Sequence, residues 1–219
     1  MNKIRGTISS RVEKAGGLKK VLFNWGFNAK AKALKKGGST PFWDRLLFDK
    51  IRTAALGGRT RLIVSGGGPL SGDVQRFMNV VFCCPVGQGY GLTETCAASS
   101  IVWADDRNVG RVGPPLLVND IKLIDWPEGG YFSDKSGSGF PEGEVCIAGD
   151  NISLGYYAQP DLTREVYVTD KDGRRWFRTG DIGRIHPDGV LQIIDRKKDL
   201  VKELAEDNAV KNYLLEKMA

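Results

Sequence analysis

Apolar and polar positions alternate with a helical period in the first part of the chain. Residues 18–36 have the pattern of an amphipathic helix, and the glycine at position 26 predicts an interruption within it. A second apolar stripe at helical spacing starts at Pro41 and continues to residue 55. Glycine pairs, which commonly end helices, follow both stripes. The pattern therefore predicts two helices in succession.

The spacing of apolar residues along the chain changes after residue 60. Residues 61–65 form a short run with β-branched side chains that leads directly into Gly-Gly-Gly-Pro at 66–69, which is typical of a strand followed by a glycine loop. Ser71 can then cap a helix that Pro85 ends. A strand, a loop and a helix in this order favour an α/β layer with a largely parallel sheet.

Beyond residue 112 the pattern is one of strands and turns. The candidate strands are residues 120–125, 144–148 and 190–194, separated by clusters of Gly, Pro and Asp. Residues 126–143 are rich in Gly, Ser and Pro, so we expect a surface loop there.

Charge is distributed unevenly over the 219 residues, whose formal net charge is +6. Residues 1–61 contain 15 Lys and Arg against 3 Asp and Glu, whereas residues 62–219 contain 17 against 23. The basic part could contact an anionic membrane face. A solvated helix surface is the simpler interpretation. No DNA-binding motif and no aromatic-basic alternation occurs, so nucleic acid is not an expected partner.

The sequence also limits location and metal chemistry. It contains neither an apolar run of about 20 residues, which a membrane-spanning helix needs, nor an apolar centre of a secretory signal near Met1. A cytoplasmic or membrane-surface location is expected. The lone His186 and the absence of a CxxC pair argue against a transition-metal centre, while Mg²⁺ remains open. We interpret the four cysteines as small buried residues: Cys83, Cys84, Cys96 and Cys146.

Three segments place glycines beside polar side chains, which allows a ligand to approach the backbone closely. They are residues 65–70, 89–95 and 177–181, and each alone is a weak signal. The glycines at 87, 89 and 91 do not have the spacing of a dinucleotide-binding motif. Residues 37–40 have the composition of a phosphate loop but lack its lysine, so they are interpreted as a linker between helices.

The order of these segments gives the chain a resemblance to a known family. The run Tyr-Gly-Leu-Thr-Glu at 90–94, the run Arg-Thr-Gly-Asp at 178–181 and the stretch 176–199 resemble the adenylate-forming superfamily. The amino-acid sequence of these stretches is similar to that of its long-chain acyl-CoA synthetases, especially those of plants. The resemblance covers residues 40–202 well and residues 1–39 loosely.

The resemblance implies the fold class and the organisation of the chain. It implies an α/β fold that is part of the large N-terminal domain of an adenylate-forming enzyme, with mixed sheets, packed helices and a small β-rich subdomain. The expected parts are a basic helical segment at 1–60, an α/β part at 61–115, a β-rich part at 116–195, and a hinge with a divergent helical tail at 196–219.

The resemblance also assigns roles to individual residues. Tyr90 would stack on adenine, Thr93 would bind a phosphate oxygen, and Glu94 would hold Mg²⁺. Asp181 would accept hydrogen bonds from the ribose hydroxyls, and Arg196 would bring positive charge to the nucleotide. Thr93, Glu94 and Arg196 would form the catalytic set, and Lys198 would be a hinge. The remaining nucleotide-binding positions would be Gly66, Gly67, Gly68, Gln88, Gly89 and Gly91.

The implied reaction activates a long-chain fatty acid with ATP to acyl-AMP and then transfers the acyl group to coenzyme A, a co-substrate. Two parts that the family uses are not found: a phosphate loop with its lysine before Gly66, and the usual continuation after Lys202. We therefore expect a truncated chain that does not complete the reaction alone.

An alternative to the enzyme is a noncatalytic remnant that binds a nucleotide or a partner such as an intact synthetase. Similar enzymes suggest the cytoplasm or a peripheral position on the endoplasmic reticulum or plastid envelope as the location.

Overall fold

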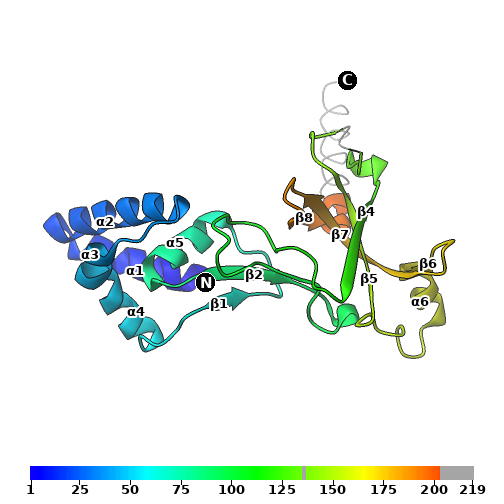
Figure 1. Cartoon of the computed structure of the whole chain (residues 1–219), viewed down its shortest axis with the longest axis horizontal. Helices are drawn as coiled ribbons and strands as arrows, with labels where there is room; N and C mark the ends of the chain where they lie inside the picture. The colour runs from blue at the N-terminus through cyan, green and yellow to red at the C-terminus, as the bar shows by residue number, and fades with distance from the viewer. Residues whose placement is uncertain (135–136, 203–219) are drawn as a thin grey trace, which may run out of the picture. The chain divides into compact units, whose positions relative to one another are not determined.

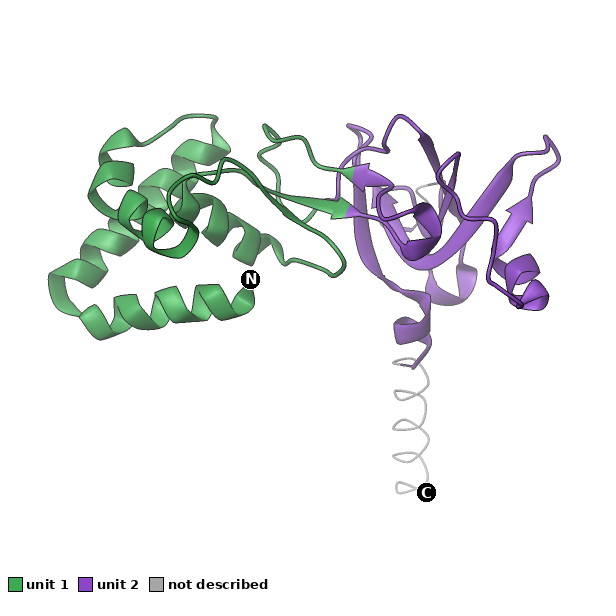
Figure 2. Ribbon diagram, turned by 90° about the horizontal axis from the view of Figure 1, so that it is seen from below, with its two compact units in different colours: residues 1–89, 101–111 green, residues 90–100, 112–219 purple. Residues whose placement is uncertain are grey.

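The computed structural model describes residues 1–134 and 137–202 (Figure 1). The chain divides into two compact units, which Figure 2 shows in green and purple. Unit 1 contains residues 1–89 and 101–111, and unit 2 contains residues 90–100 and the chain from 112 onward. The fold is mixed α/β with two sheets, as predicted.

Unit 1 begins with helices. They are α1 (Asn2–Ala15), α2 (Gly17–Lys35), α3 (Pro41–Trp43), the π-helical turn η1 (Asp44–Phe48) and α4 (Asp49–Leu56). The two predicted helices correspond to α2 and to the continuous α3–η1–α4 segment. The predicted interruption at Gly26 is wrong, because α2 runs through it. A Cβ at Gly26 would lie 2.8 Å from Cε3 of Trp43, so this glycine allows α2 to pack closely against α3.

The predicted strand, loop and helix follow these helices. Strand β1 (Ile63–Ser65) precedes α5 (Gly72–Phe82), whose N-cap Ser71 accepts a hydrogen bond from the amide of Val74 at 3.4 Å. Strand β2 (Val86–Tyr90) pairs in parallel with β1, and the strand order is β1-β2-β3, with β3 at Ser100–Ile101. The predicted parallel pairing is therefore confirmed for β1 and β2.

The core of unit 1 forms around α5. This helix has buried side chains on most of its length because its apolar residues recur every three or four positions. Burying a side chain such as Phe or Met contributes about 1.5–3 kcal/mol. The large side chains in this core are Phe23, Phe48, Val74, Phe77, Met78, Val80, Val81 and Phe82.

Unit 2 is built on a five-stranded antiparallel sheet with the order β4-β5-β7-β6, in which β8 also pairs with β7. The strands are β4 (Asn119–Ile124), β5 (Glu142–Gly149), β6 (Tyr167–Thr169), β7 (Arg175–Ile185) and β8 (Leu191–Arg196). The three candidate strands of the sequence correspond to β4, β5 and β8. This unit also contains three short helical elements: η2 (Thr93–Thr95) before β4, η3 (Pro127–Gly129) between β4 and β5, and α6 (Pro160–Val166) between β5 and β6.

Strand β7 is the centre of this sheet. Along one edge it pairs with β5, while its first residues pair with β6 and its last residues with β8. The core between the strands contains Val112, Val145, Ile147 and Leu191. Because β7 is held by three partners, side chains on it occupy fixed positions.

Two expectations about exposure need correction. The predicted surface loop at 126–143 contains η3 and a buried indole, since Trp126 is 6% exposed and stacks on Tyr131. Cys84 and Cys146 are buried as predicted, but Cys96 is exposed because it follows η2 in a left-handed conformation at the surface. Cys83 is partly exposed.

Candidate functional site

The carboxylate of Asp181 lies at the centre of a polar cluster in unit 2. The phenol of Tyr90 donates a hydrogen bond to Oδ2 of Asp181 at 2.7 Å, and Nε of Arg196 lies 3.2 Å from Oδ1. Asp181 is only 4% exposed, whereas the Arg196 side chain is 68% exposed. The structure therefore brings together three of the predicted site residues from three separate segments.

Strand pairing explains this convergence. Asp181 on β7 is the register partner of Arg196 on β8, so their side chains can meet across neighbouring strands. Strand β7 contains a bulge between the residue that pairs with Cys146 of β5 and the residue that pairs with Glu144 of β5. Gly180 lies in this bulge and has φ +70°. The Thr179 hydroxyl holds this bulge, because it donates to the Val145 carbonyl at 2.8 Å and accepts from the amide of Asp181 at 3.0 Å.

Burial sets the protonation chemistry of the cluster. Loss of hydration raises the pKa of Asp181, and the Tyr90 hydroxyl and the Arg196 guanidinium partly oppose that rise. Burial, together with the negative charge of Asp181, raises the pKa of Tyr90. Tyr90 therefore stays protonated and acts as a hydrogen-bond donor.

The segment after Tyr90 is a tight loop closed by its own backbone. Thr95, which is fully buried, accepts a hydrogen bond from the amide of Leu92 at 2.9 Å through its hydroxyl. A Cβ at Gly91 would lie 2.2 Å from the carbonyl oxygen of Ala97, so only glycine fits there. Thr93, in contrast, is exposed, which leaves its hydroxyl accessible to a ligand.

Glu94 is positioned by a residue that the sequence did not indicate. The Tyr156 hydroxyl donates to Oε1 of Glu94 at 2.5 Å, and the amide of Ser153 donates to the Glu94 carbonyl at 2.8 Å. Asn151 fixes the same loop through the carbonyls of Thr95 and Ala98, both at 2.9 Å. Burial and the Glu94 carboxylate raise the pKa of Tyr156, so it remains a donor.

The Glu94 carboxylate is the group of this loop that suits a magnesium ion. The part of the chain that the structure describes contains no group of three or more His, Cys, Asp or Glu residues that could hold a metal by themselves. Glu94 keeps one carboxylate oxygen, Oε2, without a hydrogen bond from residues 1–134 or 137–202. A single oriented carboxylate suits Mg²⁺, which is commonly bound by one or two carboxylates together with substrate phosphates.

The remaining predicted nucleotide-binding residues belong to unit 1. Gly66, Gly67 and Gly68 are exposed in the loop after β1. Gln88, at 5% exposure, uses its amide inside the unit: Oε1 accepts from the Leu70 amide at 3.2 Å. Gln88 therefore contacts the end of the glycine loop through the Leu70 amide. Gly89 follows it in β2.

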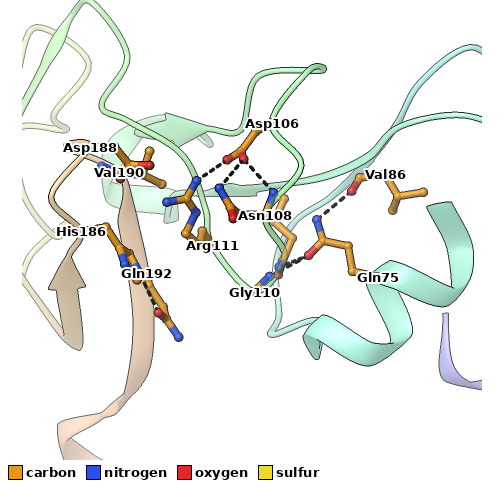
Figure 3. Close-up of polar contacts among 11 residues, drawn as sticks. Gln75, Val86, Asp106, Asn108, Gly110, Arg111, His186, Asp188, Val190 and Gln192 are labelled. Carbon is orange, nitrogen blue, oxygen red and sulfur yellow. Dashed lines mark hydrogen bonds and ion pairs between the residues drawn. The ribbon is translucent and has the colours of Figure 1, made fainter. Parts of the chain in front are cut away.

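Gln75 completes this support within unit 1. Its Oε1 accepts from Nε2 of Gln88 and from the amide of Gly110, both at 2.9 Å. Its Nε2 donates to the Val86 carbonyl at 2.8 Å, as Figure 3 shows. The Gln75 side chain is 1% exposed, so these contacts satisfy a fully buried amide.

The predicted hinge follows the cluster directly. Residues 197–202 are helical, and Lys198 is exposed. The preceding Lys197 forms an ion pair with Glu144 of β5 at 3.2 Å, and Arg178 contacts the same carboxylate at 2.5 Å. His186 is not part of this cluster: its Nε2 forms a hydrogen bond with Oε1 of Gln192 at 2.8 Å (Figure 3).

Among the helices in residues 1–134 and 137–202, none combines the length and the apolar character that crossing a bilayer requires.

Comparison with known proteins places this chain in a family. Residues 27–157 match the family model described as AMP-binding enzyme. The matched range includes the glycine loop at 66–68 and the loop at 89–94.

A curated relative and two solved structures extend the match. Long chain acyl-CoA synthetase 8 of Arabidopsis thaliana is 47% identical over 209 residues, which is 92% of this chain and 28% of the relative. ATP-bound MatB from Rhodopseudomonas palustris has a TM-score of 0.55 at 30% identity, covering 73% of this chain and 28% of that one.

The second structure is the A domain of carboxylic acid reductase from Segniliparus rugosus, in complex with AMP and a co-purified carboxylic acid. Its TM-score is 0.55 at 31% identity, covering 81% of this chain and 26% of that one. The chain thus spans little more than a quarter of the length of the proteins it matches.

Proposed function

This chain belongs to the AMP-binding enzyme family, and from that premise we propose that it forms the nucleotide-binding part of a long-chain acyl-CoA synthetase. The proposed reaction joins a fatty carboxylate to the α-phosphate of ATP with release of pyrophosphate. The thiol of coenzyme A then displaces AMP from the acyl-AMP. The observation that carries this proposal is that Tyr90 and Arg196 both contact the buried carboxylate of Asp181.

Asp181 is proposed to bind the ribose. Each carboxylate oxygen has one partner in the structure, Tyr90 on Oδ2 and Arg196 on Oδ1, and each has a further lone pair. Two ribose hydroxyls could therefore donate to the two oxygens at once. The fixed bulge at Thr179 and Gly180 holds the carboxylate in place without a ligand, which lowers the entropic cost of binding.

Tyr90 is proposed to present its ring to adenine while its hydroxyl anchors Asp181. The ring packs against the core of unit 2, and the 2.7 Å hydrogen bond prevents rotation away from it. An aromatic ring with a fixed orientation is a suitable stacking surface for a base. One residue would thus connect recognition of the base with recognition of the sugar.

Thr93 and Glu94 are proposed to serve the phosphates. The exposed Thr93 hydroxyl can donate to a phosphate oxygen, and Glu94, oriented by Tyr156, can hold Mg²⁺. When bound, Mg²⁺ would offset the negative charge that develops as the carboxylate attacks phosphorus. Arg196 would add a positive charge near the nucleotide.

The residues of unit 1 are proposed to act through the backbone. Gly66, Gly67 and Gly68 leave room for a ligand close to the chain, as would Gly89. Gly91 of unit 2 contributes in another way, because it allows its loop to close against Ala97. Gln88 contributes indirectly, because its buried amide fixes the loop at Leu70. Coenzyme A and the fatty acid would be bound with parts of the protein beyond these residues, and Lys198 would be the hinge between the two half-reactions.

We propose that the protein lies in the cytoplasm or is bound peripherally to a membrane. The membrane would be the endoplasmic reticulum or the plastid envelope. Association with an intact synthetase is the corresponding proposal for a noncatalytic form.

Calorimetric titration of the 219-residue chain with AMP tests the nucleotide assignment. We expect binding by the wild type and at least a tenfold weaker affinity for Asp181→Ala, because a hydrogen bond to a charged group contributes about 1.5–3 kcal/mol. Asp172→Ala, which changes an exposed carboxylate of the same unit, is the matched control and should bind like the wild type. Equal affinity for the wild type and Asp181→Ala would contradict the assignment.

A second assay separates an enzyme from a noncatalytic module. Formation of oleoyl-AMP from oleate and labelled ATP is measured on the same polypeptide. AMP binding without oleoyl-AMP supports a nucleotide-binding part that needs further protein segments for chemistry, and AMP binding with turnover overturns the expectation that the chain alone is incompetent.

A further inference from the structure

A buried lysine contacts a cysteine thiol within unit 1, and neither residue is among those assigned above. Lys30 on α2 is 2% exposed, and its Nζ lies 2.9 Å from Sγ of Cys83. The same ammonium is 2.6 Å from Oδ1 of Asp44 and 4.9 Å from the centre of the Phe48 ring. The amine therefore has one anionic, one aromatic and one sulfur neighbour.

The helices of unit 1 build this contact. Cys83 is the C-cap of α5 and has φ +51°, a left-handed conformation that is uncommon for a residue with a side chain. Asp44 is the first residue of η1. Lys30, Asp44 and Cys83 thus come from three elements, and the backbone of each is fixed by regular secondary structure or by a cap.

Accessibility differs between the two reacting groups. Cys83 is partly exposed as a residue, so a small oxidant has only a short distance to cover from solvent to this position. Lys30 is shielded, so the amine meets the oxidised sulfur with little competition from water. A fixed 2.9 Å separation also removes most of the entropic cost of bringing two reactants together.

We propose that oxidation of Cys83 by a peroxide joins its sulfur covalently to Nζ of Lys30, which ties helix α2 to the C-terminal end of α5. This modification site is independent of the proposed nucleotide chemistry. A sulfenic acid is known to condense with a neighbouring nitrogen. Here the nitrogen is a side-chain amine held against the sulfur.

The chemistry balances with one peroxide for each link. The Cys83 thiolate attacks a peroxide oxygen, the O–O bond breaks, and the sulfur is oxidised to a sulfenic acid while the peroxide is reduced to water. The amine of Lys30 then attacks the sulfur, an S–N bond forms, the S–O bond breaks, and a second water leaves. Two equivalents of a small thiol reverse the step, regenerating the thiol and the amine and forming one disulfide.

The surrounding charges decide how fast this occurs. Lys30 must release a proton before it attacks, and the Asp44 carboxylate at 2.6 Å can accept that proton. Burial raises the pKa of the Cys83 thiol, and the neighbouring Lys30 charge opposes the rise. The reaction should therefore be faster at mildly alkaline pH, where more of the Cys83 thiol is ionised.

The test uses the full 219-residue chain treated with hydrogen peroxide, quenched with catalase, alkylated and digested with trypsin. In the wild type we expect a linked peptide pair whose mass is the sum of the two peptides less two hydrogens. Trypsin should no longer cleave after Lys30, and dithiothreitol should restore cleavage. The melting temperature should rise after peroxide treatment, because the link closes a long loop.

Variants separate the proposal from a purely structural contact. Lys30→Arg keeps the positive charge beside Asp44 but should give no link, and Cys83→Ser should give none either. Cys96→Ser and Lys32→Arg, which change exposed residues, should form the link like the wild type. Circular dichroism of the untreated variants verifies that each is folded.

Three results would overturn the proposal. They are conversion of Cys83 to sulfinic or sulfonic acid with no linked peptide, a disulfide between Cys83 and Cys84 in place of the link, and an unchanged melting temperature together with normal cleavage after Lys30. Formation of the linked pair in the wild type and its loss in Lys30→Arg establishes the site.

Discussion

The Tyr90 hydroxyl donates a 2.7 Å hydrogen bond to Oδ2 of Asp181, a residue 91 positions later in the chain. The contact joins the end of β2 to the bulge of β7. Tyr90 belongs to the run at 90–94 and Asp181 to the run at 178–181. Removing this bond therefore measures most directly how the two runs cooperate.

Replacing Tyr90 with Phe should weaken AMP binding moderately. The ring is kept, but the Asp181 carboxylate loses a donor. Because this bond acts on the nucleotide only through Asp181, we expect AMP binding to lose part of the about 1.5–3 kcal/mol of a hydrogen bond to a charged group, roughly threefold to tenfold in affinity. Tyr90→Leu should bind more weakly still because the stacking surface is also lost. Isothermal titration with AMP measures both. Wild-type affinity for both variants would contradict the proposed role of Tyr90.

Replacing Tyr156 with Phe should affect Mg·ATP more than AMP. The change removes the donor that orients Glu94, and a hydrogen bond to a charged group contributes about 1.5–3 kcal/mol. We expect the Mg²⁺-dependent part of the ATP affinity to fall about tenfold or more, with AMP affinity unchanged.

Tyr157 provides the matched control for this experiment. It is 98% exposed, so Tyr157→Phe should behave as wild type. An equal loss of AMP and Mg·ATP binding in Tyr156→Phe would show that the hydroxyl supports the fold of the loop rather than the metal.

Nucleotide binding should be lost on acidification at a higher pH than an ordinary aspartate would give. Burial raises the pKa of Asp181, and the ionised carboxylate is the form that accepts ribose hydroxyls. AMP affinity should therefore be full above the raised pKa and fall as the pH decreases through it. Titrations over a pH series in the wild type and in Asp181→Asn check this, because the amide does not titrate and its weak affinity should vary less with pH.

The same shift has a consequence for folding with the opposite sign. A carboxyl group whose folded-state pKa is raised binds its proton more tightly in the native state. The contribution of Asp181 to stability should therefore be greatest below the usual aspartate pKa and decrease as the pH rises through the raised value. Denaturant titrations of the wild type and Asp181→Asn over that range would reveal the difference.

Replacing Gly91 with Ala should destabilise unit 2. The added Cβ would lie 2.2 Å from the Ala97 oxygen and 2.7 Å from Cα of Ala98, both backbone atoms, so the loop must shift. Overpacking of this kind costs about 1–3 kcal/mol. Urea denaturation measures the change. Gly6→Ala in α1, where a Cβ meets nothing within 4 Å, is the control and should be neutral or stabilising by about 0.5–1 kcal/mol.

Local patterns predicted the elements whose causes are local. The helix after Ser71 was evident because its cap and apolar spacing lie within twelve residues, and β4, β5 and β8 have apolar runs bounded by turn residues. In contrast, β2 and much of β7 were not proposed as strands. Their glycines and Asp181 disfavour strand by propensity, and pairing with distant segments makes them extended.

The site shows the same division between local and distant causes. Tyr90, Glu94 and Asp181 could be named because each lies in a short run with a characteristic order. Tyr156 could not, since its relation to Glu94 depends on a contact across 62 positions and no spacing within the sequence indicates it. The indirect position of Gln88 was also hidden, because a buried amide and a ligand-binding amide look identical in sequence.

The two ion pairs at the end of β8 affect the direction in which the polypeptide leaves the sheet. Arg196 and Lys197 are consecutive, yet they contact carboxylates on two different strands, Asp181 on β7 and Glu144 on β5. Displacing Arg196 would leave the buried Asp181 carboxylate without its cation, whereas Glu144 would keep Arg178 if Lys197 moved. The proposed hinge at Lys198 would then lie just beyond the residues that neutralise the sheet interior, so its position along the chain would be set by the charge of Asp181 on β7.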